Sequence, residues 1–152
     1  MIAASATDYR ELARRRLPRV LFDYIDGGSY AEETLQRNVR DFEGLALRQR
    51  VLRDVSKISL ETELFGQTMD MPVVLGPVGM AGMFARRGEV QGARAAKAAN
   101  VPFCLSTVGV CDLAEVVGGA GEAPWFQLYM IRDRGYICLL YTSPSPRDRT
   151  RS

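Results

Sequence analysis

The sequence predicts an α/β fold with a parallel sheet, and three observations support this prediction. Three short runs of strand-favouring residues recur at similar spacing, at 72–79, 102–108 and 124–129. The stretch between the first two runs has helical character, and each run ends in a polar or turn residue. Strands that alternate with helices form parallel sheets, and such sheets bind ligands at the carboxyl ends of their strands. The candidate site residues at these ends are Gly79, Ser106, Gln127 and Tyr129.

The segment before the first run begins with predicted helices. Residues 5–8 (Ser-Ala-Thr-Asp) combine candidate N-caps with an acid in the first turn, and they open a helix that reaches about residue 16. Pro18 interrupts this helix. A second helix is predicted over 20–26, and the Gly27-Gly28 pair that follows is expected to take the left-handed conformation of a helix C-cap.

Three further elements precede the first central strand. A helix is predicted over 31–42, because apolar residues recur there at i, i+4 and i+7. Residues 45–51 alternate loosely in polarity and are expected to be extended. Residues 60–70 alternate more clearly around Gly66-Gln67, which predicts a small antiparallel hairpin. This hairpin would lie just before the first central strand, where it can plug the amino-terminal mouth of a barrel.

Two helices are predicted between the central strands. The first covers about 88–100 and is rich in Ala, whose small side chain allows close packing on a sheet. The second covers 113–117, with Asp112 as its cap and Gly118-Gly119 as its end.

Composition excludes several classes of protein. The chain has 152 residues, of which 47% are hydrophobic and 25% charged, and this is enough for one globular domain with a core. No run approaches the roughly 18 apolar residues of a membrane span, and the N-terminus lacks the basic and apolar regions of an export signal. The three Cys have no metal-site spacing. Because the sequence contains no His, these residues supply neither a histidine base nor a histidine-ligated metal.

Residues 137–152 differ in character from the rest. Two prolines, a Ser/Arg mixture and the lack of apolar periodicity predict an unstructured tail. Its arginines account for the formal net charge of +2, so nothing in the remainder suggests a nucleic-acid surface. A natural disordered C-terminus is one interpretation. We favour another, because the stretch from Cys138 to Asp148 back-translates to DNA that looks like the transposon-end adapter of sequencing libraries. We therefore expect a domain over 1–136 and translated adapter over 137–152.

Taken singly, the candidate residues are weak evidence of a site. A serine or glutamine at a strand end, such as Ser106 or Gln127, is more often a polar residue with satisfied hydrogen bonds than a ligand contact. A tyrosine on a short helix, such as Tyr24, is more often a packing residue. Residues 77–79 are equally consistent with a simple turn. No Gly-x-Gly-x-x-Gly, Walker loop or metal cluster is present, so nucleotide binding by those routes is unsupported.

Together, four stretches in a fixed order resemble a known family. They are Phe-Asp-Tyr-Ile-Asp-Gly-Gly at 22–28, Leu-Gly-Pro-Val-Gly at 75–79, Leu-Ser-Thr at 105–107 and Trp-Phe-Gln-Leu-Tyr at 125–129. Their order and spacing resemble those of the FMN-dependent α-hydroxy acid dehydrogenases, which include glycolate oxidase and the lactate and mandelate dehydrogenases. The resemblance covers residues 1 to about 136. Two further stretches, 46–52 and 85–91, are most similar to the bacterial respiratory branch that oxidises L-lactate.

The resemblance implies a fold and a cofactor. The implied fold is the N-terminal part of a (β/α)8 TIM barrel, with a leading helical segment, the hairpin and about three barrel strands. FMN is expected across the carboxyl ends of the strands. Pro77, Val78 and Gly79 would pass under the flavin ring, where a residue without a side chain permits close approach. Ser106 and Gln127 would hydrogen-bond the polar edge of the flavin.

The resemblance also implies a reaction, in which an L-2-hydroxy acid is oxidised to the 2-oxo acid and two electrons pass to FMN. Tyr24 would contact the substrate carboxylate and Tyr129 its hydroxyl side. The family's histidine base, carboxylate-binding arginines and flavin-facing lysine belong to later strands, so no catalytic residue is expected here. The chain is therefore expected to be an inactive N-terminal fragment.

The implied partners are L-lactate as substrate and a respiratory electron acceptor, with no nucleic acid. The implied location is the inner face of the bacterial inner membrane, as a peripheral homo-oligomer when full length. Three alternatives remain open on the residues alone. They are a glycolate or lactate oxidase of the same family, a non-enzymatic α/β interaction module, and a phosphate-binding barrel of another chemistry.

Overall fold

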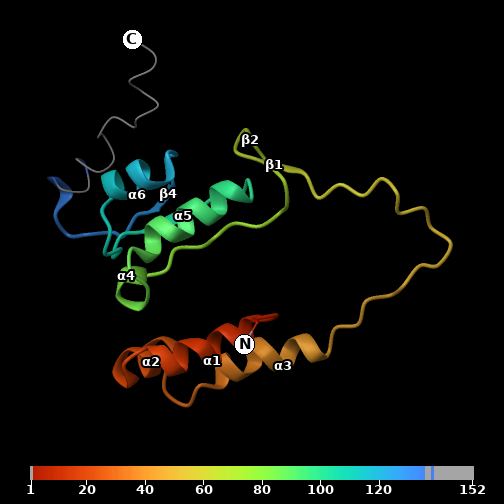
Figure 1. Cartoon of the computed structure of the whole chain (residues 1–152), viewed down its shortest axis with the longest axis horizontal. Coiled ribbons are helices and arrows are strands. Elements are labelled where there is room, and N and C mark those ends of the chain that lie inside the picture. The colour runs from red at the N-terminus through yellow and green to blue at the C-terminus, as the bar shows by residue number, and fades with distance from the viewer. Residues whose placement is uncertain (1, 136–137, 139–152) are drawn as a thin grey trace, which may run out of the picture. The chain divides into compact units, whose positions relative to one another are not determined.

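The structure is a computed structural model that describes residues 2–135 and 138 (Figure 1). It divides the chain into two compact units, which we name the N-terminal unit (Met1–Ile58) and the C-terminal unit (Ser59–Ser152). The predicted tail at 137–152, and with it the adapter hypothesis, lies outside the described residues except for Cys138, which is exposed.

The N-terminal unit is helical, as predicted. Helix α1 spans Ala6–Arg16, α2 spans Arg19–Asp26 and α3 spans Glu33–Glu43. Ser5 caps α1 in a capping box, because its hydroxyl accepts a hydrogen bond from the Asp8 N–H while the Asp8 carboxylate accepts one from the Ser5 N–H. Residues 45–51, expected to be extended, have no regular secondary structure.

The expected left-handed cap after α2 is wrong. Gly27 has φ −81° and ψ 159°, which is extended backbone that any residue adopts. The requirement for glycine comes instead from crowding. A Cβ on Gly27 would lie 2.9 Å from the Asp23 carbonyl oxygen, and one on Gly28 would lie 3.1 Å from Cβ of Leu35. The pair thus allows the start of α3 to come close to the turn that follows α2.

The C-terminal unit begins with the predicted hairpin. Strand β1 (Thr62–Leu64) pairs antiparallel with β2 (Gln67–Met69). The turn residues Phe65 and Gly66 have φ of 51° and 73°, the positive values that a two-residue hairpin turn requires.

A small parallel sheet follows, and its pairing confirms the predicted strand–helix alternation. Strand β3 (Cys104–Ser106) pairs with β4 (Trp125–Gln127) in parallel. The first predicted strand is reduced to one parallel bridge, in which the Leu75 N–H donates to the Pro102 carbonyl at 2.9 Å and the Cys104 N–H donates to the Leu75 carbonyl at 2.9 Å. Proline lacks an N–H, so Pro72 and Pro77 remove donors on both sides of this bridge.

Three helices connect these segments: α4 (Ala81–Phe84), α5 (Gly88–Ala98) and α6 (Leu113–Ala120). Side chains of α5, β3, α6 and the loop before α6 form the core, which consists of Val90, Ala93, Leu105, Cys111, Val116 and Ala120. Figure 1 shows α5 and α6 beside the strands of this unit.

The predicted end of α6 is also wrong. The helix continues through Gly118 and Gly119 to Ala120, and Gly121, with φ of 70°, forms the left-handed cap. A Cβ on Gly119 would lie 2.4 Å from Cγ1 of Val90. Gly119 therefore allows α6 to approach α5 closely, whereas Asp112 caps the start of α6 as predicted by accepting from the Glu115 N–H at 2.6 Å.

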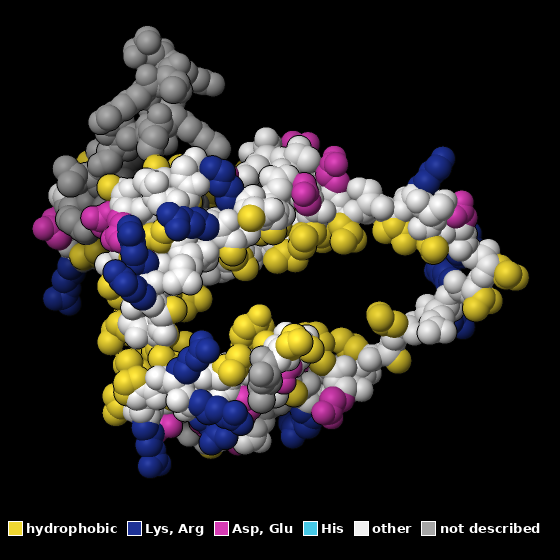
Figure 2. Space-filling view, viewed as in Figure 1, with side chains coloured by type: hydrophobic (Ala, Val, Ile, Leu, Met, Phe, Trp, Pro, Cys, Tyr) yellow, Lys and Arg dark blue, Asp and Glu magenta, His cyan; other side chains and the backbone are white. Residues whose placement is uncertain are grey.

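Two kinds of feature are absent from the part of the chain that the structure describes. Within 2–135 and 138, no helix combines the length and the apolar character that crossing a membrane requires. The same residues contain no cluster of three or more His, Cys, Asp or Glu side chains that could bind a metal ion. Many hydrophobic side chains are nevertheless exposed on the visible face of both units (Figure 2).

Candidate functional site

The predicted polar residues of the two paired strands meet at the carboxyl edge of the sheet. Ser106 ends β3 and Gln127 ends β4, and the two are register partners in the parallel pair. Ser106 is only 4% exposed, and its hydroxyl donates to Oε1 of Gln127 at 3.2 Å. Among the described residues, Nε2 of Gln127 has no hydrogen-bond partner. This amide therefore retains a donor for a molecule bound at the edge.

Thr107, which follows β3, is a member of this edge that the sequence analysis did not single out for a role. Its hydroxyl donates to the Gln127 carbonyl and accepts from the Tyr129 N–H at 3.1 Å. The two bonds fix the backbone that leads from β4 to Tyr129. Its position next to Ser106 in the Leu-Ser-Thr stretch is the sequence signal that could have identified Thr107 as part of the site.

The segment 77–79 lies against the loop that follows β3. Just after it, the Met80 N–H donates to the Val108 carbonyl at 2.9 Å, and the Val108 N–H in turn donates to Oγ of Ser106 at 3.3 Å. A Cβ on Gly79 would lie 3.0 Å from Cγ2 of Val108, while Val78 is 54% exposed. The structure thus brings residues 77–79, Ser106 and Gln127 together, with Gly79 partly exposed and packed against Val108.

The two candidate tyrosines belong to different units. Tyr129 follows β4 in the C-terminal unit and is 45% exposed, whereas Tyr24 lies on α2 of the N-terminal unit and is 67% exposed.

A buried carboxylate near this edge escaped the sequence analysis. Glu89, the second residue of α5, is 2% exposed, and its Oε1 accepts from the Gly82 N–H at 3.0 Å and the Val110 N–H at 2.8 Å. Burial by itself raises the pKa of Glu89, but N–H donors from Val110, Glu89 itself and Gly82, with the Cys111 thiol, outweigh it. The pKa therefore lies below the ordinary 4.5. Nothing in the Ala-rich pattern of α5 distinguishes this acid from a solvated one.

The thiol of Cys111 adjoins this carboxylate inside the core. Burial, together with the hydrogen bond and the negative charge of Glu89, raises the pKa of the Cys111 thiol to about 11. The thiol is therefore protonated at neutral pH and acts as a weak donor to the carboxylate.

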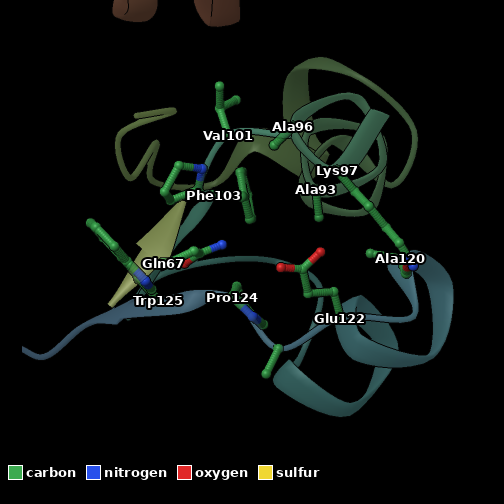
Figure 3. Close-up of a pocket in the computed structure, with 12 residues that line it drawn as sticks. Gln67, Ala93, Ala96, Lys97, Val101, Phe103, Ala120, Glu122, Pro124 and Trp125 are labelled. Atoms are coloured by element: carbon green, nitrogen blue, oxygen red, sulfur yellow. The ribbon is translucent and has the colours of Figure 1, made fainter. Parts of the chain in front are cut away.

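A pocket is present at the other end of the strands (Figure 3). Its walls include residues that precede β3 and β4, such as Phe103 and Pro124, with Gln67 of the hairpin. Phe65 at the hairpin turn also contacts Trp125 edge-to-face, with ring centroids 5.6 Å apart. The hairpin therefore lies at the amino ends of these strands, as predicted, and this pocket is distinct from the candidate site.

Comparison with known proteins identifies the wider family. The model of the FMN-dependent dehydrogenase family matches residues 13–140. The L-lactate dehydrogenase of Caulobacter sp. (strain K31) is 65% identical over 137 residues, which are 90% of this chain and 36% of that protein. The chain thus spans about a third of the length of this curated relative.

Two solved structures show the same similarity at the level of the fold. The monotopic membrane protein (S)-mandelate dehydrogenase matches 93% of this chain and 38% of its own, at 32% identity and a TM-score of 0.86. Mandelate oxidase matches 98% of this chain and 42% of its own, at 33% identity and a TM-score of 0.85. On the evidence of the family match and of this sequence relative, the chain belongs to the FMN-dependent dehydrogenase family.

Proposed function

We propose that this chain is the N-terminal part of an FMN-dependent L-lactate dehydrogenase, which oxidises L-lactate to pyruvate and passes the electrons to a respiratory acceptor. The observation that carries the proposal is the joint placement of residues 77–79, Ser106 and Gln127 at one carboxyl edge. The similarity to an L-lactate dehydrogenase supports the choice of substrate. In this proposal the Leu75 segment, β3 and β4 are the first three strands of a (β/α)8 barrel.

The residues at this edge fit FMN. Bound FMN supplies a two-electron acceptor. Gly79 has no side chain, which permits a flat ring to lie close to its backbone. A Cβ at this position would also crowd Val108. The donor Nε2 of Gln127 suits a carbonyl or ring nitrogen of the flavin, and the Ser106 hydroxyl orients that amide by donating to its Oε1. Pro77 and Val78 would contribute apolar contact below the ring.

The two tyrosines would recognise the substrate. We assign Tyr24 to the carboxylate and Tyr129 to the hydroxyl side of L-lactate, because a phenol can donate to one and accept from the other. Thr107 would position Tyr129 through its hydrogen bond to the Tyr129 N–H. The base that removes a proton from the substrate, and the groups that bind the FMN phosphate, would lie outside these 152 residues.

The test begins with a read of the source DNA across the codons for residues 134–138, from an unfragmented template. If the frame continues, the full-length protein is purified and mixed with L-lactate without oxygen. We expect stoichiometric FMN and loss of flavin absorbance on mixing, and no such loss with the 152-residue chain. A full-length protein without FMN, or one whose flavin L-lactate does not reduce, would contradict the proposal. So would L-lactate-reducible FMN in the 152-residue chain.

An oxidase of the same family is the second candidate, because mandelate oxidase is among the similar structures. The two are separated by supplying the full-length protein with L-lactate and either oxygen or a quinone. Faster turnover with the quinone is expected. We further propose that the full-length protein is a peripheral homo-oligomer at the membrane, and the monotopic membrane protein (S)-mandelate dehydrogenase supports the membrane association alone. Salt extraction of membranes followed by size-exclusion chromatography tests both properties.

A further inference from the structure

Glu89 is an unusual residue for the interior of this unit. It and Ser106 are the buried polar or charged side chains found within the described residues. Its Oε2 is buried without a hydrogen-bond partner of normal geometry among those residues. Burying a carboxylate is costly unless it is hydrogen-bonded, so the two N–H donors to Oε1 are the contacts that make this position possible.

The contacts of Glu89 link two loops that are distant in sequence. Gly82 belongs to α4, which comes just after the segment 77–79, and Val110 lies in the loop after β3. Both N–H groups donate to the same oxygen, Oε1. The two loops also touch there, because a Cβ on Gly82 would lie 2.8 Å from Cβ of Val110.

These two loops carry the proposed flavin contacts. The first leads directly from Gly79, and the second directly from Ser106. One further bond joins them nearer the edge, from the Met80 N–H to the Val108 carbonyl. The bonds to Glu89 therefore join the two loops at a second place, farther from the edge.

We propose that Glu89 is a positioning residue that holds the segment 77–79 and Ser106 at the separation that the flavin requires. This inference rests on the proposed function. A single carboxylate oxygen that accepts two N–H groups makes charge-assisted hydrogen bonds, which are stronger than neutral ones. The N-terminus of α5 favours the negative charge, and the helix provides a rigid base for the tie.

The experiment compares three variants of the full-length protein: Glu89→Ala, Glu89→Gln and Glu115→Gln. Glu115 is the matched control, because it is the third residue of α6 and makes an exposed ion pair with Arg87 at 2.7 Å. We expect Glu89→Ala to raise the FMN dissociation constant by about tenfold or more. Glu89→Gln keeps an oxygen that can accept from both N–H groups and should raise it only about threefold. Glu115→Gln should leave it unchanged.

Two further readouts separate positioning from a general loss of structure. At saturating FMN, the KM for L-lactate should be the same in all variants. Hydrogen exchange of peptides that contain Gly82 and Val110 should quicken in Glu89→Ala and be largely restored in Glu89→Gln, while peptides from α6 keep their protection.

Several results would overturn the inference. Unchanged FMN affinity and unchanged exchange in Glu89→Ala would do so, as would equal effects of Glu89→Ala and Glu115→Gln. If Glu89→Ala does not fold, Glu89→Gln decides, and an FMN affinity equal to that of the parent protein counts against the inference. If the parent protein binds no FMN, the proposed function fails, and exchange at Gly82 and Val110 still decides whether Glu89 ties the loops.

Discussion

The two units of this chain are stabilised in different ways. Within the described part of the N-terminal unit, Phe22 is the one hydrophobic residue that is buried. The helices of this unit are stabilised by a capping box and by exposed ion pairs. The C-terminal unit instead has a core in which α5, α6 and β3 meet. Local signals are enough to define helices, but burial against distant residues supplies most of the stability of a fold. Substitutions should therefore have larger effects in the C-terminal unit.

The largest effect is expected from Gly119→Ala. The new Cβ would overlap Val90, and overpacking of this kind costs about 1–3 kcal/mol of the free energy of unfolding. Gly118→Ala is the matched control, because a Cβ there meets nothing within 4 Å and should stabilise α6 by about 0.5–1 kcal/mol. Urea unfolding of the full-length variants measures both. Effects of the same sign would show that the close contact of α5 and α6 does not exist.

The second effect is a dependence of stability on pH. Because the pKa of Glu89 is lower in the folded protein than its ordinary 4.5, the carboxylate stabilises the fold above about pH 4.5. This contribution is lost as the pH falls from there through the folded pKa. Glu89→Gln should therefore be less stable than the parent at neutral pH, with a smaller loss on acidification. Parallel urea midpoints for the two proteins between about pH 3 and pH 6 would contradict this.

A smaller effect is expected at the end of α6. Lys97 on α5 donates to the carbonyls of Ala120 at 2.9 Å and Gly121 at 3.3 Å, where the helix dipole favours a cation. Lys97→Met keeps the apolar stem and removes the charge, so we expect a loss of about 0.5–1 kcal/mol. Lys57, the other lysine of the sequence, is exposed in the N-terminal unit, and Lys57→Met is the control. Equal thermal stability of the two variants would contradict a stabilising role for Lys97 at the end of α6.

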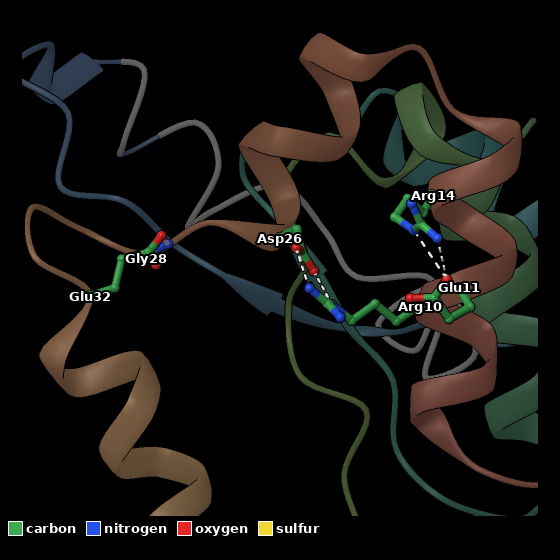
Figure 4. Close-up of polar contacts among 6 residues, drawn as sticks. All are labelled: Arg10, Glu11, Arg14, Asp26, Gly28 and Glu32. Carbon is green, nitrogen blue, oxygen red and sulfur yellow. Dashed lines mark hydrogen bonds and ion pairs between the residues drawn. The ribbon is translucent and has the colours of Figure 1, made fainter.

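The smallest effect is expected in the N-terminal unit, at the ion pair of Arg10 and Asp26 (Figure 4). Here the guanidinium binds both carboxylate oxygens, with Nη2 at 2.7 Å from Oδ2, and its hydrogen bonds lower the pKa of Asp26. Arg10→Gln should return that pKa toward 3.8, with little change in melting temperature, because exposed ion pairs contribute little. NMR titration of Asp26 measures the first quantity. A large drop in melting temperature would show that this unit depends on the pair more than we expect.

The sequence predicts most elements of both units because their signals are local. The capping residues at 5–8, the hairpin turn at Gly66 and the Asp112 cap each act within a few residues of the chain. Both predictions made from glycine pairs are wrong, because each assigned to backbone conformation a requirement that comes from packing. The crowding atoms belong to Asp23 and Leu35 for the first pair and to Val90, which is distant in the sequence, for Gly119. A pattern along one segment does not reveal such a neighbour.

The sequence predicts part of the candidate site, as it predicts most of the fold. Strand ends locate Ser106 and Gln127, and the structure confirms that they meet. The FMN and substrate roles of the site residues stay predictions. Glu89 could not be found in this way, because its importance comes from two backbone N–H groups on other loops. A buried charge with backbone partners has no signature in side-chain patterns.

The edge of β4 has a consequence for how such a protein is made. Within the described residues β4 pairs with β3 alone, and Phe126 on it remains 39% exposed. An open strand edge is a template for pairing with other chains. In the proposed full-length barrel, made at roughly 5–20 residues per second, this edge would emerge from the ribosome before the later strand that is to cover it. The growing chain would then depend on chaperones to prevent aggregation, and translation speed after β4 would influence the yield of folded enzyme.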